Sequence, residues 1–319
     1  MMDLSILIVN WNAKEYLKDC LNSIYTGVKN IAFEIIVVDN LSSDNSREMI
    51  KKEFVNVILI ENNINNGYGK ANNQAIQVSN GQYILVLNPD TIIYPGSLEI
   101  LTGYLETHPE VGAVGPKIRN SDGSIQYECA RHMPTPLTEL FSMSTLDKRF
   151  PKSKIFGRYL MSYWDHNDLR KVDLLSGACM MLRKRVFDEI GKFDESFFMY
   201  AEEPDLFMRI KKAGWEIHYL PSAEIKHLWG KSAKQIPIEM AVESRISMEI
   251  FFRKYYGVMS VIAHRITVML ISAIFTILWI FAYIVSTNEK RTKAKNLYMA
   301  NIAMFCWSAG IKWKRIKKN

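Results

Sequence analysis

The chain has 319 residues, of which 48% are hydrophobic and 23% are charged, and it contains no low-complexity tract or internal repeat. This balance is that of a globular protein large enough for one α/β domain with an appendage. The net charge of +7 is concentrated in residues 289–319, where nine basic residues accompany one acid. The four cysteines are far apart and form no CxxC pair, which argues against a zinc site or a disulfide framework and indicates reduced thiols: Cys20, Cys129, Cys179 and Cys306.

In the N-terminal part, short runs rich in Ile and Val alternate with helical patterns over 13–25 and 70–79. This order predicts an α/β fold with a mostly parallel sheet flanked by helices. The first apolar run starts within the first four residues, so we expect no secretory signal. The predicted strands cover residues 4–10, 34–40, 56–61 and 83–90.

Polar residues close each of these runs. In open α/β sheets, ligands bind beyond the carboxyl ends of the strands, so the closing residues predict a binding rim. They are Asn10, Asp39, Asn62 and Asp90.

Residues 130–172 do not continue the alternation of strands and helices, because three prolines interrupt them. We predict that they form a long, partly helical excursion that serves as a lid or acceptor loop. A strand and a helix start follow over 172–187, and a further helix over 203–214 ends at Gly214. Two short strands are expected at 215–221 and 223–229. From residue 236 onward the pattern is helical.

Two strand ends carry candidate chemistry. Asn88 and Asp90 follow a buried run, and a carboxylate there can hold Mg²⁺ or Mn²⁺ against two phosphates; a plain turn is the alternative. Asp39 can accept hydrogen bonds from a nucleobase or a ribose. Gly67 and Gly69 precede a helix and permit close approach of an anion, although the third glycine of a dinucleotide fingerprint is absent.

The densest acidic cluster is Glu202, Glu203 and Asp205. A crowded, partly desolvated carboxylate has a raised pKa, which suits a general base. Alternatively, acids at a helix N-terminus interact favourably with its dipole. Both interpretations hold together if Asp205 is structural and Glu203 faces the site.

Three further residues are candidates for the same site. His227 closes a predicted strand after the acidic helix, where it can complete a metal site. Lys231 and Arg245 can neutralise a leaving diphosphate, or else they are solvated surface charges.

Six segments, taken together in this order, resemble the family 2 glycosyltransferases with a GT-A fold, and most closely the bacterial rhamnosyltransferase branch. They are LSILIVNWN, VVDNLSSDNS, NNGYGKANN, LNPDT, SGACMMLRKRVFDEIGKFDESFFMYAEEPDL and HLWGKS. The resemblance covers residues 3–256. It implies a catalytic domain over 1–235, with a nucleotide-sugar half at 1–116 and an acceptor half at 117–235, followed by a helical region at 236–319.

The resemblance also implies roles for single residues. The catalytic base would be Glu203, and Asp90 would be a catalytic metal ligand, joined by His227. Two departures from the family pattern stand out: only Asp90 supplies charge in NPD, and the base position reads EE where ED is frequent. The implied donor-binding residues are Val9, Asn10, Asp39, Gly67, Asn72 and Asn88. Candidate diphosphate or acceptor contacts are Glu202, Gly177, Lys231 and Arg245.

The implied reaction is a single in-line displacement that inverts the anomeric carbon, assisted by Mg²⁺ or Mn²⁺. The expected donor is a dTDP- or UDP-sugar, rhamnose or similar. The expected acceptor is a hydroxyl of a glycan or lipid-linked sugar in cell-surface polysaccharide synthesis, and no nucleic-acid partner is expected.

Two other protein classes would show a different set of residues. A nucleotidyltransferase that makes sugar nucleotides needs a glycine-rich basic loop after its first strand, whereas this chain reads NWNAKEYL there. A non-catalytic, membrane-tethered binding protein would not need the acidic cluster together with NPD and His227.

Residues 266–285 carry no charge and are long enough to cross a bilayer as a helix; a buried core helix is the alternative. Basic residues flank the segment on both sides. A second apolar stretch at 297–311 is short for a span, and it would lie in the interface or return as a hairpin. We therefore expect a single-pass or monotopic protein on the cytoplasmic face of the inner membrane.

Overall fold

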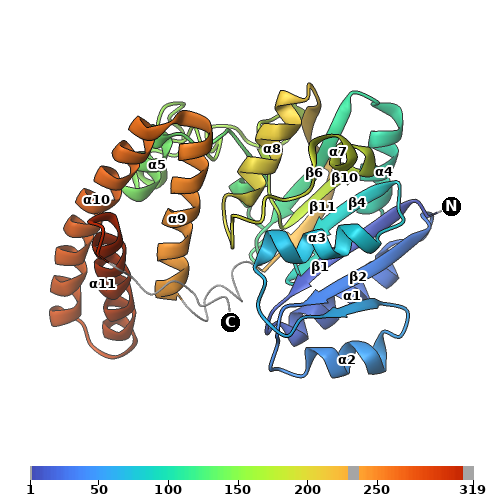
Figure 1. Ribbon diagram of the computed structural model, residues 1–319, viewed down its shortest axis with the longest axis horizontal. Helices are drawn as coiled ribbons and strands as arrows, with labels where there is room; N and C mark the ends of the chain where they lie inside the picture. Colours follow the sequence, from blue (N-terminus) through green and yellow to red (C-terminus); the bar gives the residue numbers. More distant parts are fainter. Residues whose placement is uncertain (1, 229–236, 312–319) are drawn as a thin grey trace.

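The computed structural model describes residues 2–228 and 237–311. Figure 1 shows a sheet-containing body, which carries the N-terminus, and a group of helices at the opposite end of the molecule. The strands of the body are β1 (Leu4–Asn10), β2 (Phe33–Asp39), β3 (Ile58–Glu61), β4 (Tyr83–Leu87), β5 (Thr91–Ile93), β6 (Val111–Arg119), β10 (Cys179–Arg183) and β11 (Glu216–His227). Its helices are α1 (Lys14–Gly27), α2 (Ser46–Glu53), α3 (Tyr68–Val78), α4 (Ser97–Thr107), α7 (Lys184–Ile190) and α8 (Glu202–Lys212).

The main sheet has the strand order β3-β2-β1-β4-β10-β6-β11-β5. The neighbours β3, β2, β1 and β4 are parallel, as are β6 and β11, which confirms the prediction of a mostly parallel α/β sheet. Strand β10 is antiparallel to both neighbours, and β5 is antiparallel to β11. The β1–β2 register pairs Asn10 with Asp39, so two predicted rim residues are neighbours at one sheet edge.

The prediction of two separate strands at 215–221 and 223–229 is wrong, because one strand, β11, spans Glu216–His227. Its pairing with β6 shifts between Leu220 and Glu224, around Pro221. A proline cannot donate to a β-ladder and is tolerated at a bulge. The chain therefore continues past the irregularity and carries His227 to the edge where β5 begins.

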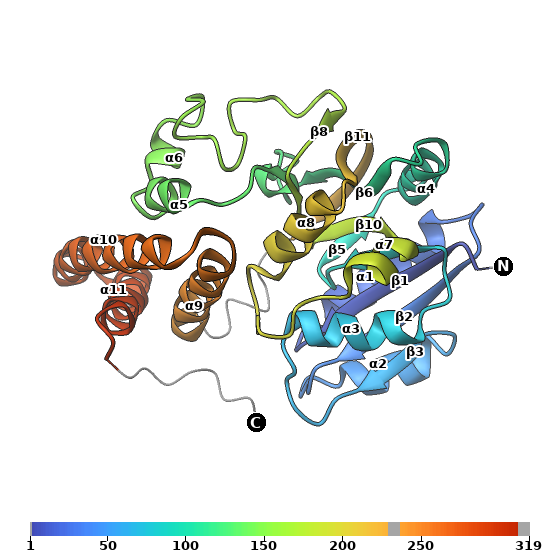
Figure 2. The ribbon, with the colours of Figure 1, turned by 45° about the horizontal axis from the view of Figure 1, so that its top comes forward.

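The excursion between β6 and β10 is partly helical, as predicted, and lies beside the C-terminal helices (Figure 2). Its helix α5 packs on α10, and α6 packs on α5. Its elements are η1 (Tyr127–Cys129), β7 (Ala130–Arg131), α5 (Pro136–Met143), α6 (Leu146–Arg149), β8 (Arg170–Lys171) and β9 (Leu174–Leu175).

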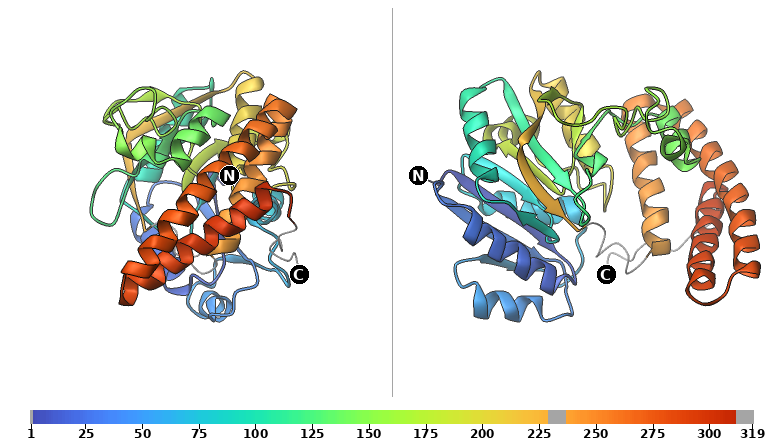
Figure 3. Two further views of the ribbon diagram at one scale, coloured as in Figure 1. Left: turned by 90° about the vertical axis from the view of Figure 1, so that its left-hand side faces the viewer. Right: turned by 180° about the vertical axis from the view of Figure 1, so that it is seen from behind.

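Three helices follow the body: α9 (Pro237–Tyr256), α10 (Val258–Val285) and α11 (Asn288–Ser308). Helices α10 and α11 pack along each other as a hairpin, which both views of Figure 3 show. Helix α10 is long and apolar enough to cross a membrane, and only 11% of its most apolar window is buried. This exposure contradicts the alternative of a buried core helix. The stretch 297–311 lies largely in α11 and returns along α10.

Candidate active site

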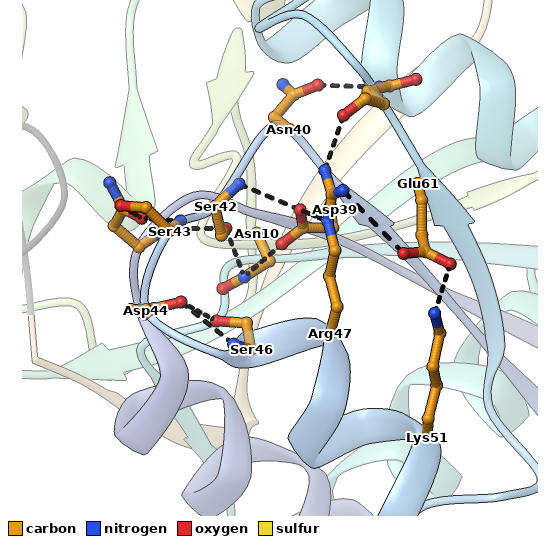
Figure 4. Close-up of polar contacts among 12 residues, drawn as sticks. Asn10, Asp39, Asn40, Ser42, Ser43, Asp44, Ser46, Arg47, Lys51 and Glu61 are labelled. Carbon is orange, nitrogen blue, oxygen red and sulfur yellow. Dashed lines mark hydrogen bonds and ion pairs between the residues drawn. The ribbon is translucent and has the colours of Figure 1, made fainter.

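The first corner of the site joins the ends of β1 and β2 (Figure 4). Asn10 Nδ2 donates to Asp39 Oδ2 at 3.0 Å, and Arg47 Nε donates to Asp39 Oδ1 at 2.6 Å. The backbone N–H of Ser42 also donates to Oδ1, at 3.0 Å. Burial alone would raise the pKa of Asp39, but these hydrogen bonds outweigh it and hold the pKa below its ordinary value. Asp39 is therefore an ionised, fully buried clamp between the two strand ends and α2.

The glycine loop closes this corner. Gly67 has φ +77°, and a Cβ there would lie 2.2 Å from the carbonyl oxygen of Phe198, in the loop before α8. Asn40 Nδ2 donates to the Gly67 carbonyl at 3.0 Å, and Asn72 Nδ2 donates to the Tyr68 carbonyl at 3.0 Å. Glycine at 67 thus lets the loop contact both Asn40, the residue after β2, and the segment that leads to α8.

Asn88, Asp90 and His227 meet at the second corner. The antiparallel pairing of β5 with β11 places His227 opposite Thr91, beside the NPD segment. His227 Nε2 lies 3.1 Å from Asp90 Oδ1 and 3.4 Å from Asn88 Nδ2. Asp90 and His227 are both buried. The structure therefore brings together the residues predicted to hold a metal.

A chain of amides orients His227. Asn120 Nδ2 donates to the Ile125 carbonyl at 3.3 Å, which turns Asn120 Oδ1 toward Gln126 Nε2 at 2.9 Å. Gln126 Oε1 then faces His227 Nδ1 at 2.7 Å. Because this oxygen only accepts, His227 Nδ1 donates to it, and Nε2 is the ring nitrogen that faces Asp90.

This arrangement fits a divalent cation. A carboxylate oxygen and an imidazole nitrogen, which lie 3.1 Å apart here, are two atom types that coordinate divalent cations. Among the residues that the structure describes, no group of three or more His, Cys, Asp or Glu side chains could hold a metal. Mg²⁺ commonly takes one or two protein ligands and completes its shell with substrate phosphates and water, so two ligands suffice beside a diphosphate.

The third corner is the start of α8. The chain enters the helix through Tyr200 and Ala201, which have φ values of 67° and 60°. The turn directs the Glu203 carboxylate to the Gly177 backbone, whose N–H donates to Oε1 at 2.7 Å. Arg131 Nη2 lies 3.8 Å from the other oxygen, Oε2. Glu203 therefore has one firm hydrogen bond, one cation close by and a partly exposed side chain.

The other two acids of the cluster have different surroundings. Glu202 is buried and its Oε2 has no hydrogen-bond partner within the described chain. Burial, and then the charge of Glu203, raises the pKa of Glu202 well above its ordinary value, which favours its protonated form. Asp205 bonds to Arg209 and to Lys254 of α9, at 2.9 and 2.6 Å, so it is structural, as predicted.

Tyr68 links the second and third corners. Its Oη lies 2.9 Å from the Gly177 carbonyl and 3.4 Å from Asn88 Oδ1. Burial, followed by the charges of Glu203 and Glu202, raises the pKa of Tyr68 well above its ordinary value, so it stays a neutral donor. The metal-binding candidates and the base candidate thus belong to one connected cluster.

Not every predicted residue lies in this cluster. Arg245 is on α9, where it forms an ion pair with Glu139 of α5, and burial lowers its pKa to about 10. Its described contacts are with α5 and α10, not with Asp90. Gly177 is a neighbour of Glu203 and packs tightly against it. Lys231 lies outside the described residues, and Val9 is half-buried beside Asn10.

Sequence reasoning missed Arg131, Tyr68, Gln126 and Arg47. The side chain of Arg131 is 12% exposed. It bonds to Tyr159 Oη at 2.9 Å, and its Nε is buried without a partner among the described residues. An arginine with a buried, unused donor atom is a strong signal in a structure. In the sequence it is one cation among forty basic residues.

Comparisons with known proteins place this site in context. The family described as Glycosyl transferase family 2 matches residues 5–191. The N-acetylglucosaminyl-diphospho-decaprenol L-rhamnosyltransferase of Mycobacterium tuberculosis is 31% identical over 259 residues, which cover 78% of this chain and 83% of that protein. The rhamnosyltransferase WbbL of Escherichia coli is 26% identical and covers 70% of this chain and 82% of its own length.

A solved structure shares the fold. It is a mannosyltransferase from Pyrobaculum calidifontis in complex with GDP-Man and Mn²⁺, with a TM-score of 0.54 and 13% identity. The match covers 95% of this chain and 87% of that one.

Proposed function

The chain belongs to glycosyl transferase family 2, and we propose that it is an inverting enzyme of cell-surface glycan synthesis. It transfers rhamnose or a similar sugar from a dTDP- or UDP-linked donor to a hydroxyl of a glycan or lipid-linked acceptor. The names of its relatives, two of them rhamnosyltransferases, support this substrate class.

The proposal rests on one observation: Tyr68 contacts both the segment predicted to bind the metal and the backbone that holds the predicted base. Its hydroxyl reaches both Asn88, beside Asp90, and Gly177, whose N–H holds Glu203. A group that binds a diphosphate and a group that removes a proton are thus connected through one residue. In-line displacement requires these groups on opposite sides of one reacting carbon.

On the donor side, we assign the nucleoside to the edge formed by β1, β2 and the glycine loop. Asn10, Gly67 and Asn72 line this edge, and Val9 is half-buried beside them. Asn10 Oδ1 and Asn72 Oδ1 are buried acceptors without a partner in the described chain. Asp39 keeps Asn10 in place, because its oxygens are already bonded to Asn10, Ser42 and Arg47.

Asp90 and His227 would hold the divalent cation, Mg²⁺ or Mn²⁺, with Gln126 fixing the imidazole. When bound, such a cation stabilises the negative charge of the departing diphosphate. The mannosyltransferase solved with GDP-Man and Mn²⁺ supports this assignment at the level of the fold.

On the acceptor side, Glu203 accepts the proton of the attacking hydroxyl. The Gly177 N–H holds Oε1, and Arg131 lies near Oε2, so the carboxylate has a defined direction. The acceptor oxygen attacks the anomeric carbon while the diphosphate leaves, which inverts the configuration. General-base assistance of this kind contributes about 10²–10⁴-fold in rate.

The experiment that tests this function uses membranes containing the full-length protein and a panel of sugar nucleotides. We expect nucleoside diphosphate release with one donor when a lipid-linked acceptor is present, and release that is about 10²–10⁴-fold slower from a Glu203→Gln variant. Absence of release across the panel, or equal release from the variant, would contradict the proposal.

Helix α10 supports a membrane location. Exposed apolar residues recur along one face at helical spacing, whereas Ser260, His264, Val268 and Ser272 on the opposite face are buried. The exposed face includes Ile266, Leu270, Ile274, Ile277 and Phe281. Since sugar nucleotides are made in the cytoplasm, we place the catalytic body on the cytoplasmic side.

Replacing Ile274, Ile277 and Phe281 together with Gln tests the anchor. These side chains are exposed, so the fold should persist while the protein moves from the membrane fraction to the soluble fraction. Wild-type protein found in the soluble fraction without detergent would refute the membrane location.

A further inference from the structure

A basic surface segment lies beside the C-terminal helices. Residues 146–158, here called the basic loop, contain five basic residues and one acid, and that acid, Asp147, is buried. All five cations are exposed, and none forms an ion pair with another residue in the described part of the chain. They are Lys148, Arg149, Lys152, Lys154 and Arg158.

Large apolar side chains are interspersed with these cations. Phe150 is 48% exposed and Ile155 is 64% exposed, and Leu137 of the adjoining helix α5 is 56% exposed. A charged surface that contacts only water would not need exposed apolar side chains. Alternating cations and exposed apolar groups match the boundary of a bilayer, where headgroup phosphates lie above acyl chains.

The position of the basic loop agrees with its composition. Helix α5 packs on α10, and Arg245 of α9 forms an ion pair with Glu139 of α5. Figure 1 places α5 and α10 together at the end of the molecule away from the N-terminus, and Figure 2 shows α6 beside α5. The basic loop begins with α6, which packs on α5, and α5 packs on α10, the helix with the exposed apolar face.

We propose that the basic loop is a second membrane contact, which binds the phosphates of anionic lipids beside the α10 anchor. The inference rests on the proposed membrane location and adds a partner of defined chemistry. It also assigns a role to the excursion between β6 and β10.

This contact would align the site with the bilayer. The loop ends one residue before Tyr159, whose hydroxyl accepts a hydrogen bond from Arg131. Arg131 in turn lies 3.8 Å from Glu203. A loop held on headgroups therefore places the acceptor side of the site next to the surface from which a lipid-linked acceptor would emerge.

The test measures where the loop lies in full-length protein reconstituted into vesicles. An environment-sensitive fluorophore is attached at Ile155→Cys in a Cys306→Ser background, because the other three cysteines are buried. Quenching by nitroxide-labelled lipid is compared between vesicles with and without phosphatidylglycerol. A label at Val55→Cys, an exposed position of the sheet-containing body, is the matched control.

We expect strong quenching at 155 in anionic vesicles, weak quenching in neutral vesicles, and none at 55. Each basic residue near an anionic surface contributes roughly fivefold to binding, so Lys148→Gln, Lys152→Gln and Lys154→Gln together should weaken the loop contact by about 100-fold. High salt should have the same effect. The control variant replaces Lys29, Lys52 and Lys192, which are exposed residues of the body, and should leave quenching unchanged.

The outcomes separate the two proposals. Protein that floats with the vesicles but shows no quenching at 155, or equal quenching in neutral vesicles, overturns the loop contact and leaves the anchor intact. Protein that does not float with any vesicle overturns both.

Discussion

Gly177→Ala should impair catalysis without disturbing the fold. A Cβ at this position would lie 2.2 Å from Glu203 Oε1, whereas real Cβ contacts essentially never fall below 3.0 Å. The carboxylate oxygen must therefore move by about 0.8 Å. The nearest obstructing atom is the end of a flexible side chain, and φ of Gly177 is not left-handed, so the substitution costs the fold little. A base misplaced by about 1 Å loses on the order of 10²-fold in rate.

The assay is nucleoside diphosphate release at saturating donor, with kcat and the donor KM measured separately. We expect kcat to fall by about 100-fold and the donor KM to stay nearly constant, because the donor corner does not include Gly177. Gly103→Ala is the control: its Cβ meets nothing within 4 Å, and alanine favours the helix.

A double-substitution cycle tests the cause. In a Glu203→Asp background the carboxylate is one methylene shorter, so Gly177→Ala should cost less there than in the wild-type background. A kcat for Gly177→Ala within about threefold of wild type, or an identical cost in both backgrounds, would refute the assignment of Glu203 as a base held by Gly177.

Four further predictions follow from the site. Glu203→Gln should lower kcat by about 10²–10⁴-fold, whereas Glu202→Gln, which mimics the protonated form that burial favours, should remain nearly as active; the reverse result would put the base at 202. Asp90→Ala should abolish transfer and weaken Mn²⁺ binding measured by electron paramagnetic resonance, and full wild-type activity in excess EDTA would contradict this. Gln126→Leu should weaken Mn²⁺ binding by about 10–100-fold through loss of the imidazole orientation, so unchanged binding would exclude that role. Asp39→Ala should raise the donor KM more than it lowers kcat. Because the folded pKa of Asp39 is lowered, its ionisation stabilises the fold above about pH 4, and this stabilisation is lost as pH falls through the folded pKa. The variant should therefore show a flatter decrease of unfolding free energy in acid, and an unchanged curve would argue against the clamp.

For the C-terminal helices, the local sequence pattern predicts the helix but not whether the helix is buried. An uncharged run at 266–285 predicts a long apolar helix, and the structure contains it within α10. Whether such a helix is buried depends on its neighbours, which lie elsewhere in the chain. Only the packed structure shows that α10 leaves its apolar face exposed and that α11 returns along it.

Strand β6 illustrates a feature that local patterns hide. Its sequence VGAVGPKIR contains two glycines and a proline, which weaken the signal of a strand. In the structure, side chains at Gly112 and Gly115 would collide with Trp215 and Leu175, so each glycine makes room for a residue about 60 to 100 positions away. The reason for these glycines therefore appears only in three dimensions.

By itself, the sequence determined the family, the α/β class and the polar ends of the strands. The comparisons confirm the family, and the sheet confirms the fold class. These properties were accessible because hydrophobic periodicity and motif order are written along the chain. They predict that Asn10, Asp39 and Asp90 lie at one edge of a sheet.

The tertiary structure alone decided which side chains meet. In the structure the Gly177 N–H donates to Glu203, and Tyr68 lies between Gly177 and Asn88. Arg245 lies away from this cluster, where α9 meets α5. The partners of these contacts are separated by 20 to 109 residues. Hydrogen bonds form within about 3 Å and depend on side-chain direction, which no local pattern encodes.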